Sequence, residues 1–458
     1  MATKYDAIII GTGQAGPSLA GRLADSGMKV AVIERKRFGG TCVNNGCIPT
    51  KTLIVSARAA YVARRGAEFG VMTSGPITVD MKKVKARKDA VVRRSNEGVE
   101  KWMKTTENIT VYEGHARFES SHTVRVGDEL LEAEKIFINV GGRASTPAIP
   151  GLDQVSHLNN SSMMEVDFLP EHLLIVGGSY IGLEFGQMYR RFGSEVTIVE
   201  KGPRLIARED TDVSDTIKEI LENEGINIHL NAECIGVERD GDKIAMNLNC
   251  DSGEKITGSH LLLAVGRVPN TYDLGLEKAG ITVNNHGYIQ VDDQLRTNVE
   301  GVYALGDCNG RGAFTHTAYN DFEIVAANLL DNDPRRVSDR ITAYALYIDP
   351  PLGRGGMSEA EVRKSGRKAL RAKRAMERVG RAFEKGETQG FMKILVDAET
   401  KEILGASLLG IECDEIIHII LDVMYAKAPY TVIQRAMHIH PTVAELLPTM
   451  LGELEPFE

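Results

Sequence analysis

The chain has 458 residues, 43% of them hydrophobic and 26% charged, which is enough for about three domains with buried cores. Its 63 acidic residues outnumber 54 Lys and Arg, and the net charge of −9 argues against a nucleic-acid partner. No apolar run approaches the roughly 18 residues that cross a bilayer, and residues 1–6 leave no room for a signal peptide. Six cysteines are too few for a secreted disulfide scaffold. We therefore expect a soluble, cytoplasmic, multidomain protein that acts without nucleic acid or membrane.

The start of the chain has the pattern of a strand, a glycine-rich turn, a helix and a second strand. The β-branched run 7–10 is too short for a helix and is typical of a buried parallel strand. Gly11, Gly13 and Gly16 follow it, and the next strand ends in Glu34. Glycines let the backbone approach a pyrophosphate, the helix N-terminus offers free N–H groups, and the carboxylate accepts hydrogen bonds from ribose hydroxyls. This order predicts a dinucleotide-binding βαβ unit.

A second unit of the same kind lies near the middle of the chain. Its turn carries Gly177, Gly178 and Gly182, and its second strand ends in Glu200. Ser179 stands where the fingerprint has its middle glycine, and we expect this small side chain to be accommodated. Two βαβ units predict two nucleotide-binding domains.

The carboxylate of the second unit bears on the choice of nicotinamide cofactor. Glu200 favours NADH over NADPH, because a carboxylate repels the 2′-phosphate of NADPH. Lys201 and Arg204 lie close by in the sequence, and these basic residues weaken the predicted preference for NADH.

The sharpest motif spans residues 39–51, with the sequence GGTCVNNGCIPTK. Cys42 and Cys47 are spaced so that they can bridge around a distorted helical turn. If Pro49 occupies an early helical position, Cys47 lies near a helix N-terminus, where the dipole lowers a thiol pKa. Such a pair is typical of a redox-active dithiol. The alternatives are two ordinary thiols or a zinc pair, and zinc needs further ligands for which the chain offers no second CxxC-type pair. We expect Cys308 to be a buried small residue beside the cofactor, and we assign no role to Cys234, Cys250 and Cys413.

The C-terminal part of the chain has a different sequence pattern. Ser358 starts a capping box before a short helix that Gly366 is expected to end. Alternating segments at 391–396 and 403–409 predict strands, and a helical pattern follows at 414–426. We expect an α+β interface domain here.

Together these motifs resemble the class I pyridine nucleotide–disulfide oxidoreductases, the group of glutathione reductase, dihydrolipoamide dehydrogenase and mercuric reductase. The resemblance covers essentially the whole chain. It implies an α/β fold with two Rossmann-like domains, one for FAD and one for NAD, and a C-terminal α+β dimerisation domain. The implied ranges are 1–146 and 268–336 for the FAD-binding domain, 147–267 for the NAD(P)H-binding domain, and 337–458 for the dimerisation domain.

Further motifs follow in the family's order. Residues 297–307 are similar to the second FAD motif, in which the aspartate, here Asp307, bonds the ribityl chain. Tyr180 matches an aromatic lid over the flavin. The resemblance implies that the cofactor-binding residues are Gly11, Gly13, Gly16, Glu34, Gly40, Thr41, Gly142, Gly177, Gly178, Tyr180, Ile181, Gly182, Glu200, Gly266 and Asp307. No metal site is expected.

The resemblance also implies the catalytic residues and their roles. Glu184 matches the carboxylate paired with Lys51 near the flavin ring, and residues 438–445 match the C-terminal His-Pro motif. There the histidine acts as acid–base and the glutamate orients it. The implied catalytic residues are Cys42, Cys47, Lys51, Glu184, His440 and Glu445.

The implied reaction passes electrons from NADH through FAD to the Cys42–Cys47 disulfide and on to a small-molecule acceptor. Cys47 is the flavin-proximal sulfur, and Cys42 is the outer sulfur that attacks the substrate. In the family the histidine reaches the site from the other subunit, so the resemblance implies a homodimer.

Departures from the family pattern favour one subgroup. The tail 446–458 has no cysteine, whereas mercuric reductases of the resistance type and large thioredoxin reductases carry a C-terminal pair. The chain is therefore most similar to mercuric-reductase-like flavoproteins that lack this pair, a set that includes reductases of hypothiocyanous acid and flavoproteins of reactive-chlorine defence. Dihydrolipoamide dehydrogenase is the alternative, and an FAD redox sensor without turnover is the alternative of another class. Dihydrolipoamide, a small disulfide, Hg(II) and a hypothiocyanous-type oxidant stay open as acceptors.

Overall fold

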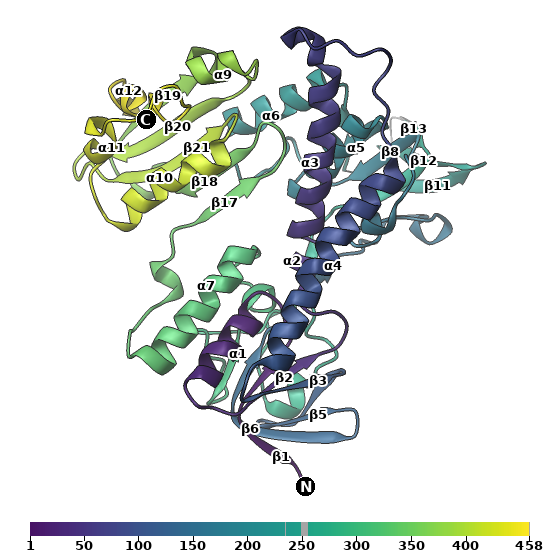
Figure 1. Cartoon of the computed structure of the whole chain (residues 1–458), viewed down its shortest axis with the longest axis vertical. Helices are drawn as coiled ribbons and strands as arrows, with labels where there is room; N and C mark the ends of the chain where they lie inside the picture. Colours follow the sequence, from purple (N-terminus) through teal and green to yellow (C-terminus); the bar gives the residue numbers. More distant parts are fainter. Residues whose placement is uncertain (234, 249–254, 458) are drawn as a thin grey trace.

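The N-terminal lobe is built on a seven-stranded sheet in the order β3-β2-β1-β6-β5-β4, with β16 also pairing β6. A computed structural model describes residues 1–233, 235–248 and 255–457. The parallel strands of this sheet are β1 (Thr3–Ile10), β2 (Val30–Glu34), β3 (Ile109–Glu113), β6 (Glu129–Ile138) and β16 (Val302–Ala304). The antiparallel ones are β4 (Ala116–Ser120) and β5 (Thr123–Val126). Because β16 comes from much later in the chain than β1, two separate stretches of sequence form this lobe (Figure 1).

Helices cover this sheet and connect it to the rest of the molecule. The helix after the first glycine turn, α1 (Ala15–Asp25), contacts α7 (Thr315–Ala326). The cysteine motif forms α2 (Gly40–Asn44) and the start of α3 (Cys47–Arg64), and α3 lies beside α4 (Met81–Thr105). Short 3-10 or π helices are Gly66–Phe69, Leu152–Gln154, Ser162–Glu165, Leu276–Ala279, Gly306–Asn309, Ala327–Asp331, Val337–Asp339 and Met376–Arg378.

The second lobe carries the second glycine turn. Its parallel sheet has the order β10-β9-β8-β14, formed by β8 (His172–Val176), β9 (Glu195–Val199), β10 (Asn227–His229) and β14 (His260–Leu263). Its helices are α5 (Tyr180–Phe192) and α6 (Thr211–Asn223), and a small antiparallel sheet consists of β11 (Gly236–Asp240), β12 (Lys243–Asn247) and β13 (Lys255–Gly258). The chain enters the lobe at β7 (Gly142–Ala144) and leaves at β15 (Arg267–Pro269), and these two strands pair antiparallel.

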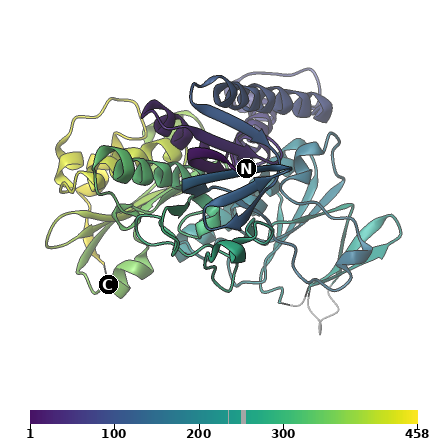
Figure 2. The same ribbon diagram turned by 90° about the horizontal axis from the view of Figure 1, so that it is seen from below.

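The C-terminal lobe contains a six-stranded antiparallel sheet in the order β17-β18-β21-β20-β19-β22. Its strands are β17 (Ala343–Leu346), β18 (Leu352–Gly356), β19 (Ala369–Ala375), β20 (Phe391–Asp397), β21 (Ile403–Leu409) and β22 (Glu455–Phe457). Its helices are α8 (Glu359–Ser365), α9 (Gly380–Glu384), α10 (Cys413–Tyr425), α11 (Thr431–Arg435) and α12 (Leu446–Leu451). Seen from below, this lobe and the second lobe lie on opposite sides of the N-terminal lobe (Figure 2).

The local predictions for the C-terminal lobe are confirmed, with one difference in burial. Ser358 caps α8 through a capping box, and Gly366 ends the helix at a φ of 71°. Every residue of β20 and β21 is buried, whereas an alternating pattern predicts one exposed face. Residues such as Ile394 pack in the core under α10, while Lys393 on the opposite face meets the second lobe. Both faces are therefore covered.

Among the described residues, no helix has the length and apolarity that a bilayer crossing requires.

Candidate active site

One cavity of about 1940 Å³ is lined by both glycine turns, both connecting strands, the cysteine motif and the start of α7. The predicted site residues on its wall are Gly11, Gly13, Glu34, Gly40, Thr41, Cys42, Cys47, Lys51, Gly142, Gly177, Gly178, Tyr180, Ile181, Glu184, Glu200, Gly266 and Asp307. Residues from the three predicted ranges 1–146, 147–267 and 268–336 therefore meet on the wall of this cavity. Gly16 and Gly182 pack beneath the turns, and His440 and Glu445 lie outside the cavity.

The first glycine turn forms a cradle that side chains would fill. Gly11 has a φ of 103°, and a Cβ atom there would lie 2.4 Å from the carbonyl oxygen of Asn139. A Cβ on Gly16 would lie 2.3 Å from the carbonyl oxygen of Gly11. Thr12 donates its N–H and its hydroxyl to Glu34 Oε2, at 3.0 and 2.6 Å. Sequence reasoning missed Thr12 and Asn139, which shape the turn without belonging to its glycine pattern. The free backbone fits a pyrophosphate, and Glu34 fits a ribose.

The second glycine turn repeats this construction with one substitution. Gly177 has a φ of 114°, and a Cβ on Gly182 would lie 2.0 Å from the carbonyl oxygen of Gly177. Ser179 is extended, with a φ of −115°, so a serine replaces the middle glycine without strain. Glu200 Oε2 accepts a hydrogen bond of 2.7 Å from the N–H of Gly178. This turn therefore fits a second dinucleotide.

The two cysteines of the motif lie on consecutive helices. Cys42 is in α2, and Cys47 is the first residue of α3, with Pro49 in its first turn as the sequence predicts. Both are free thiols and half-buried. Cys308 and Cys413 are free, fully buried thiols, and Cys234 and Cys250 lie outside the described residues.

The two thiols differ in acidity. A hydrogen bond from Cys42 is the main cause that lowers the pKa of the Cys47 thiol to about 6, against the effect of burial. Thr315 Oγ1, 3.0 Å from Cys47 Sγ, and the charge of Lys51 lower it further. The same hydrogen bond raises the pKa of Cys42. These opposite shifts favour the thiolate form at Cys47 and the thiol form at Cys42. Thr315 has no local sequence signal, because only the packing of α7 against the motif creates this contact.

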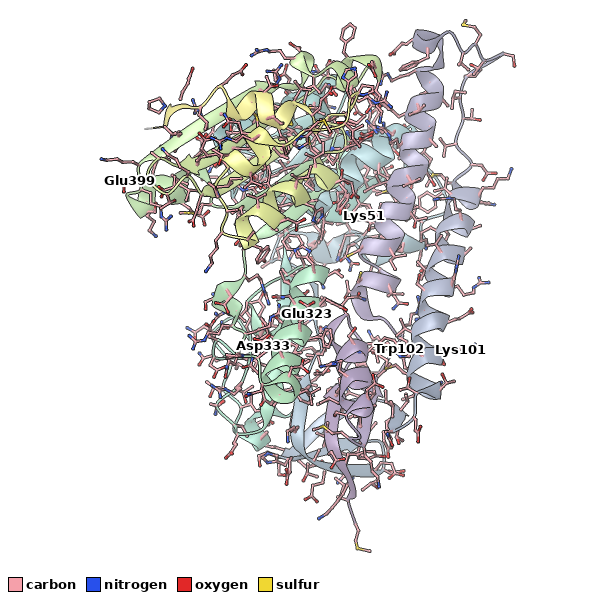
Figure 3. The ribbon with its side chains drawn as sticks, turned by 60° about the vertical axis from the view of Figure 1, so that its left-hand side comes forward. Lys51, Lys101, Trp102, Glu323, Asp333 and Glu399 are labelled. Atoms are coloured by element: carbon pink, nitrogen blue, oxygen red, sulfur yellow. The ribbon has the colours of Figure 1, made fainter. Side chains whose placement is uncertain are left out.

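Lys51 and Glu184 form the predicted pair at the centre of the molecule. Lys51 Nζ lies 2.7 Å from Glu184 Oε2, with Lys51 on α3 between the lobes (Figure 3). Glu184 Oε1 accepts the N–H of Tyr347 at 3.1 Å, and Lys51 Nζ lies 4.5 Å above the ring centre of Tyr347. Tyr347 therefore contacts both members of the pair, and sequence reasoning missed it.

Asp307 lies next to the paired connecting strands β7 and β15. Burial raises the pKa of Asp307, and Arg267, whose Nε is 3.5 Å away, opposes this effect. Arg267 also donates to the carbonyl oxygen of Gly142 at 2.6 Å. A half-buried carboxylate on the cavity wall fits a hydrogen bond from a polyhydroxyl chain such as ribityl.

The histidine pair is intact but lies apart from the thiols in this chain. His440 Nδ1 lies 2.9 Å from Glu445 Oε2, and the His440 side chain is 80% exposed. Met437 and Ile439 beside it are also exposed. The structure brings His440 and Glu445 together but not, within one chain, to Cys42.

Two Rossmann-like lobes joined by a cavity with a thiol pair define a dinucleotide-dependent disulfide oxidoreductase. The chain belongs to the pyridine nucleotide-disulphide oxidoreductase family: the model of that description matches residues 5–321, and the model of the family's dimerisation domain matches residues 342–451. The family implies FAD and a nicotinamide cofactor.

Relatives cover nearly the whole chain. The probable pyridine nucleotide-disulfide oxidoreductase RclA of Escherichia coli K12 is 36% identical over 452 residues, which are 97% of this chain and 98% of the relative. A dihydrolipoyl dehydrogenase of Haloferax volcanii and a mercuric reductase of Streptomyces lividans are each 32% identical, over 97% of this chain and 95% of theirs. The structure described as "HOCl-induced flavoprotein disulfide reductase RclA from Escherichia coli" has a TM-score of 0.90 and 35% identity, with 98% and 99% coverage.

These findings confirm the predicted family, fold class and enzyme class. The chain is an NAD(P)H-dependent flavoprotein oxidoreductase of this disulfide-reductase family.

Proposed function

We propose that the chain is an NADH-dependent reductase whose electrons reach a small-molecule acceptor through the Cys42–Cys47 pair. The observation that carries this proposal is the position of both thiols on the wall of the cavity that joins the two glycine turns. When bound, FAD would supply the two-electron relay between a nicotinamide ring and a disulfide.

The chain's own residues account for the step at sulfur. Cys42 attacks the acceptor; with a disulfide acceptor, this forms a mixed disulfide and releases one thiol. Cys47, kept as a thiolate by its low pKa, then attacks Cys42 and releases the second thiol. The acceptor is thereby reduced by two electrons and the Cys42–Cys47 disulfide is formed. Lys51, held by Glu184, places a positive charge near the Cys47 thiolate throughout.

We propose that the working unit is a homodimer in which His440 of one chain serves the thiols of the other. Glu445 binds Nδ1 of His440, which leaves Nε2 to accept and return the Cys42 proton. The exposed Met437 and Ile439 give this end of the dimerisation domain an apolar surface for a second copy. A dithiol that cycles on NADH needs a reducing compartment, so we place the enzyme in the cytoplasm.

For the acceptor, we propose an oxidant, a small disulfide or a metal ion in preference to dihydrolipoamide. The relative RclA is described as HOCl-induced, and one of its structures as a Cu(II) complex. Dihydrolipoamide is the second candidate, supported by the relatives of that activity at 32% identity.

The hydrogen bonds of Glu200 and Arg204 near the second turn support the preference for NADH. Glu200 lines the cavity, and its two oxygens accept N–H groups of Gly178 and Gly202. The Arg204 guanidinium donates to Thr211 and to the carbonyl of residue 207, so it is already bound within its loop. We expect kcat/KM for NADH to exceed that for NADPH by about tenfold, or about 1.4 kcal/mol. Equal values would contradict this preference, and Glu200→Gln should narrow the gap.

Anaerobic titration of the purified flavoprotein with NADH tests the proposed function. A long-wavelength absorbance at two electrons per flavin, due to a thiolate next to the flavin, supports it; its absence favours a redox sensor without turnover. A protein that takes up no flavin overturns the proposal. Steady-state rates with dihydrolipoamide, oxidised glutathione, Hg(II) and hypothiocyanous acid then rank the acceptors.

A further inference from the structure

Three aromatic side chains from distant parts of the chain meet beside the second glycine turn. Tyr180 opens α5, Phe314 precedes α7, and Tyr344 lies on β17. The Tyr180 ring stands edge-on to both others, with centroids 6.0 Å from Phe314 and 5.6 Å from Tyr344. Tyr180 and Phe314 line the cavity, and Phe314 stacks on Tyr344 at 5.5 Å. The Tyr180 ring therefore rests against an aromatic wall.

The hydroxyl groups of Tyr180 and Tyr344 both contact the buried carboxylate of Glu209. The Glu209 side chain has no exposed surface, and its Oε1 lies 2.6 Å from the Tyr344 hydroxyl and 3.5 Å from the Tyr180 hydroxyl. Among the described residues, no group donates a hydrogen bond to Oε2, and Arg354 Nη1 lies 3.9 Å from it. A buried carboxylate with so few donors depends strongly on each of them. The Tyr344 hydroxyl is therefore its main hydrogen bond.

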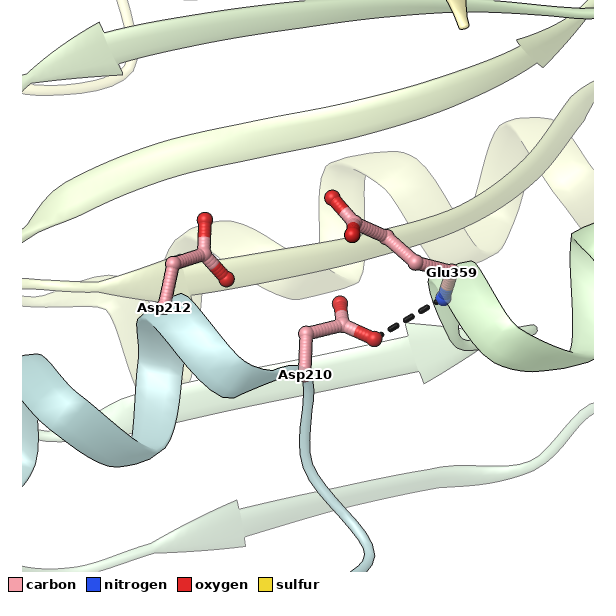
Figure 4. A group of neighbouring side chains, drawn as sticks. All are labelled: Asp210, Asp212 and Glu359. Atoms are coloured by element: carbon pink, nitrogen blue, oxygen red, sulfur yellow. Dashed lines mark hydrogen bonds between the residues drawn. The ribbon is translucent and has the colours of Figure 1, made fainter. Parts of the chain in front are cut away.

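An ion-pair network holds Asp210, the residue that follows Glu209, in place. Arg354 of β18 lies 3.2 Å from Asp210 Oδ2, and Lys393 of β20 lies 2.9 Å from the same atom. Lys393 Nζ is also 2.7 Å from Asp212 and 2.9 Å from Glu359, so its ammonium lies among three carboxylates. Figure 4 shows these three carboxylates, those of Asp210, Asp212 and Glu359, close together. Because these cations belong to the C-terminal lobe, that lobe anchors the start of α6, just after Glu209.

The docked ring faces the reactive part of the cavity. Tyr180 and Glu184 are one turn apart on α5 and share a face of the helix. Glu184 pairs with Lys51, which is one turn after Cys47 on α3. A nicotinamide ring that delivers electrons toward the thiols therefore has to enter beside Tyr180.

We infer that Glu209 and Tyr344 are positioning residues that dock the Tyr180 ring against the cavity wall and keep the place of the nicotinamide ring open. This inference rests on the proposed function, since it concerns the entry of NADH. Without the hydroxyl contacts, the Tyr180 side chain gains rotamer freedom and competes with the nicotinamide ring for the same space. Neither Glu209 nor Tyr344 lines the cavity, so both act through Tyr180.

The test uses the FAD-loaded protein with Tyr344→Phe and, separately, Tyr180→Phe. Each change removes one hydroxyl and keeps the ring. We expect KM for NADH to rise about fivefold with kcat nearly unchanged, a loss of about 1 kcal/mol. Equilibrium titration should show the same loss for NAD⁺ and none for ADP-ribose, which carries no nicotinamide ring.

Two further measurements distinguish the loss of Tyr180 docking from a general loss of structure. In the Tyr180→Phe/Tyr344→Phe double variant, the loss should be no larger than in either single variant, because both remove the same docking. Tyr189→Phe is the matched control: it is a buried tyrosine on the same helix, between Phe185 and Phe192, and should change neither affinity.

Unchanged NAD⁺ affinity in both single variants overturns the inference, as does an equal loss for ADP-ribose. If Tyr344→Phe does not fold because Glu209 loses its main donor, Tyr180→Phe still decides, since it leaves the Glu209–Tyr344 bond in place. If the proposed function is wrong, the wild-type protein is not reduced by NADH. The comparison of NAD⁺ with ADP-ribose needs no turnover, so the two failures can be told apart.

Discussion

The thiol pair and the histidine pair of the proposed active site differ in how completely one chain surrounds them. Cys47 is half-buried and in contact with Thr315 of a distant helix, and the nearby Lys51 is held by Glu184 and Tyr347. His440 has one partner, Glu445, and is 80% exposed. The difference teaches that one chain encloses the thiol half of the proposed site and leaves the histidine half exposed, and for this reason we propose that a second chain completes the site.

The largest effect is expected at the thiol half. Cys42→Ser removes the attacking sulfur, so turnover with disulfide or oxidant acceptors should fall by at least about a thousandfold. Steady-state assays with the preferred acceptor measure this loss. Cys413→Ala, at a buried thiol of α10 remote from the cavity, should retain turnover. Full turnover of Cys42→Ser would contradict the proposed chemistry.

The next largest effect is expected at the histidine half. His440→Gln should slow the acceptor step by about a hundredfold, the scale of lost acid–base catalysis. Reduction by NADH, followed by stopped-flow absorbance, should be unchanged, because that step takes place in the thiol half.

Mixed dimers test the assignment of the two halves to different chains. A dimer of one Cys42→Ser chain and one His440→Gln chain, purified through two different tags, has one intact site if the histidine comes from the partner. It should show about half the wild-type activity, since one of two sites works. If each site uses its own chain's histidine, no site is intact, and the mixed dimer should keep at most about 1% of the wild-type activity.

A smaller effect is expected from the ion pair beside the thiols. Glu184→Gln leaves Lys51 without its charged partner, and loss of a charge-assisted hydrogen bond of about 1.5 kcal/mol should slow reduction by NADH about tenfold. Stopped-flow absorbance at saturating NADH measures this rate. The exposed Glu222→Gln on α6, which loses only its pair with Lys218, is the control and should behave as wild type.

The smallest effect concerns the acidity of Cys47. Because its pKa is lowered to about 6, the thiolate absorbance of the two-electron-reduced protein should persist at neutral pH and disappear as the pH falls through about 6. Thr315→Val removes a hydrogen bond that lowers this pKa, so the midpoint should move upward by about half a pH unit. Thr315→Ser should keep the wild-type midpoint. A midpoint near that of an ordinary thiol in the wild type would contradict the asymmetry of the pair.

Local signals in the sequence predicted the elements that carry the site. The glycine turns, the cysteine motif at the start of α3 and the capping box of α8 each depend on a few consecutive residues, because backbone sterics and capping act over one turn of chain. Contacts between distant segments had no such signal. Thr315 on Cys47, Tyr347 on Lys51 and Tyr344 on Glu209 exist only because α7 and β17 pack where they do.

By itself, the sequence determined two glycine turns between strand and helix, a thiol pair at a helix start and a histidine followed by the glutamate that contacts it, since each is encoded in a short stretch of chain. Only the tertiary structure decided that both faces of β20 and β21 are covered and that His440 lies apart from the thiols. The physical reason is that burial and distance depend on which surfaces meet, and that depends on the packing of whole lobes rather than on the residues next in line.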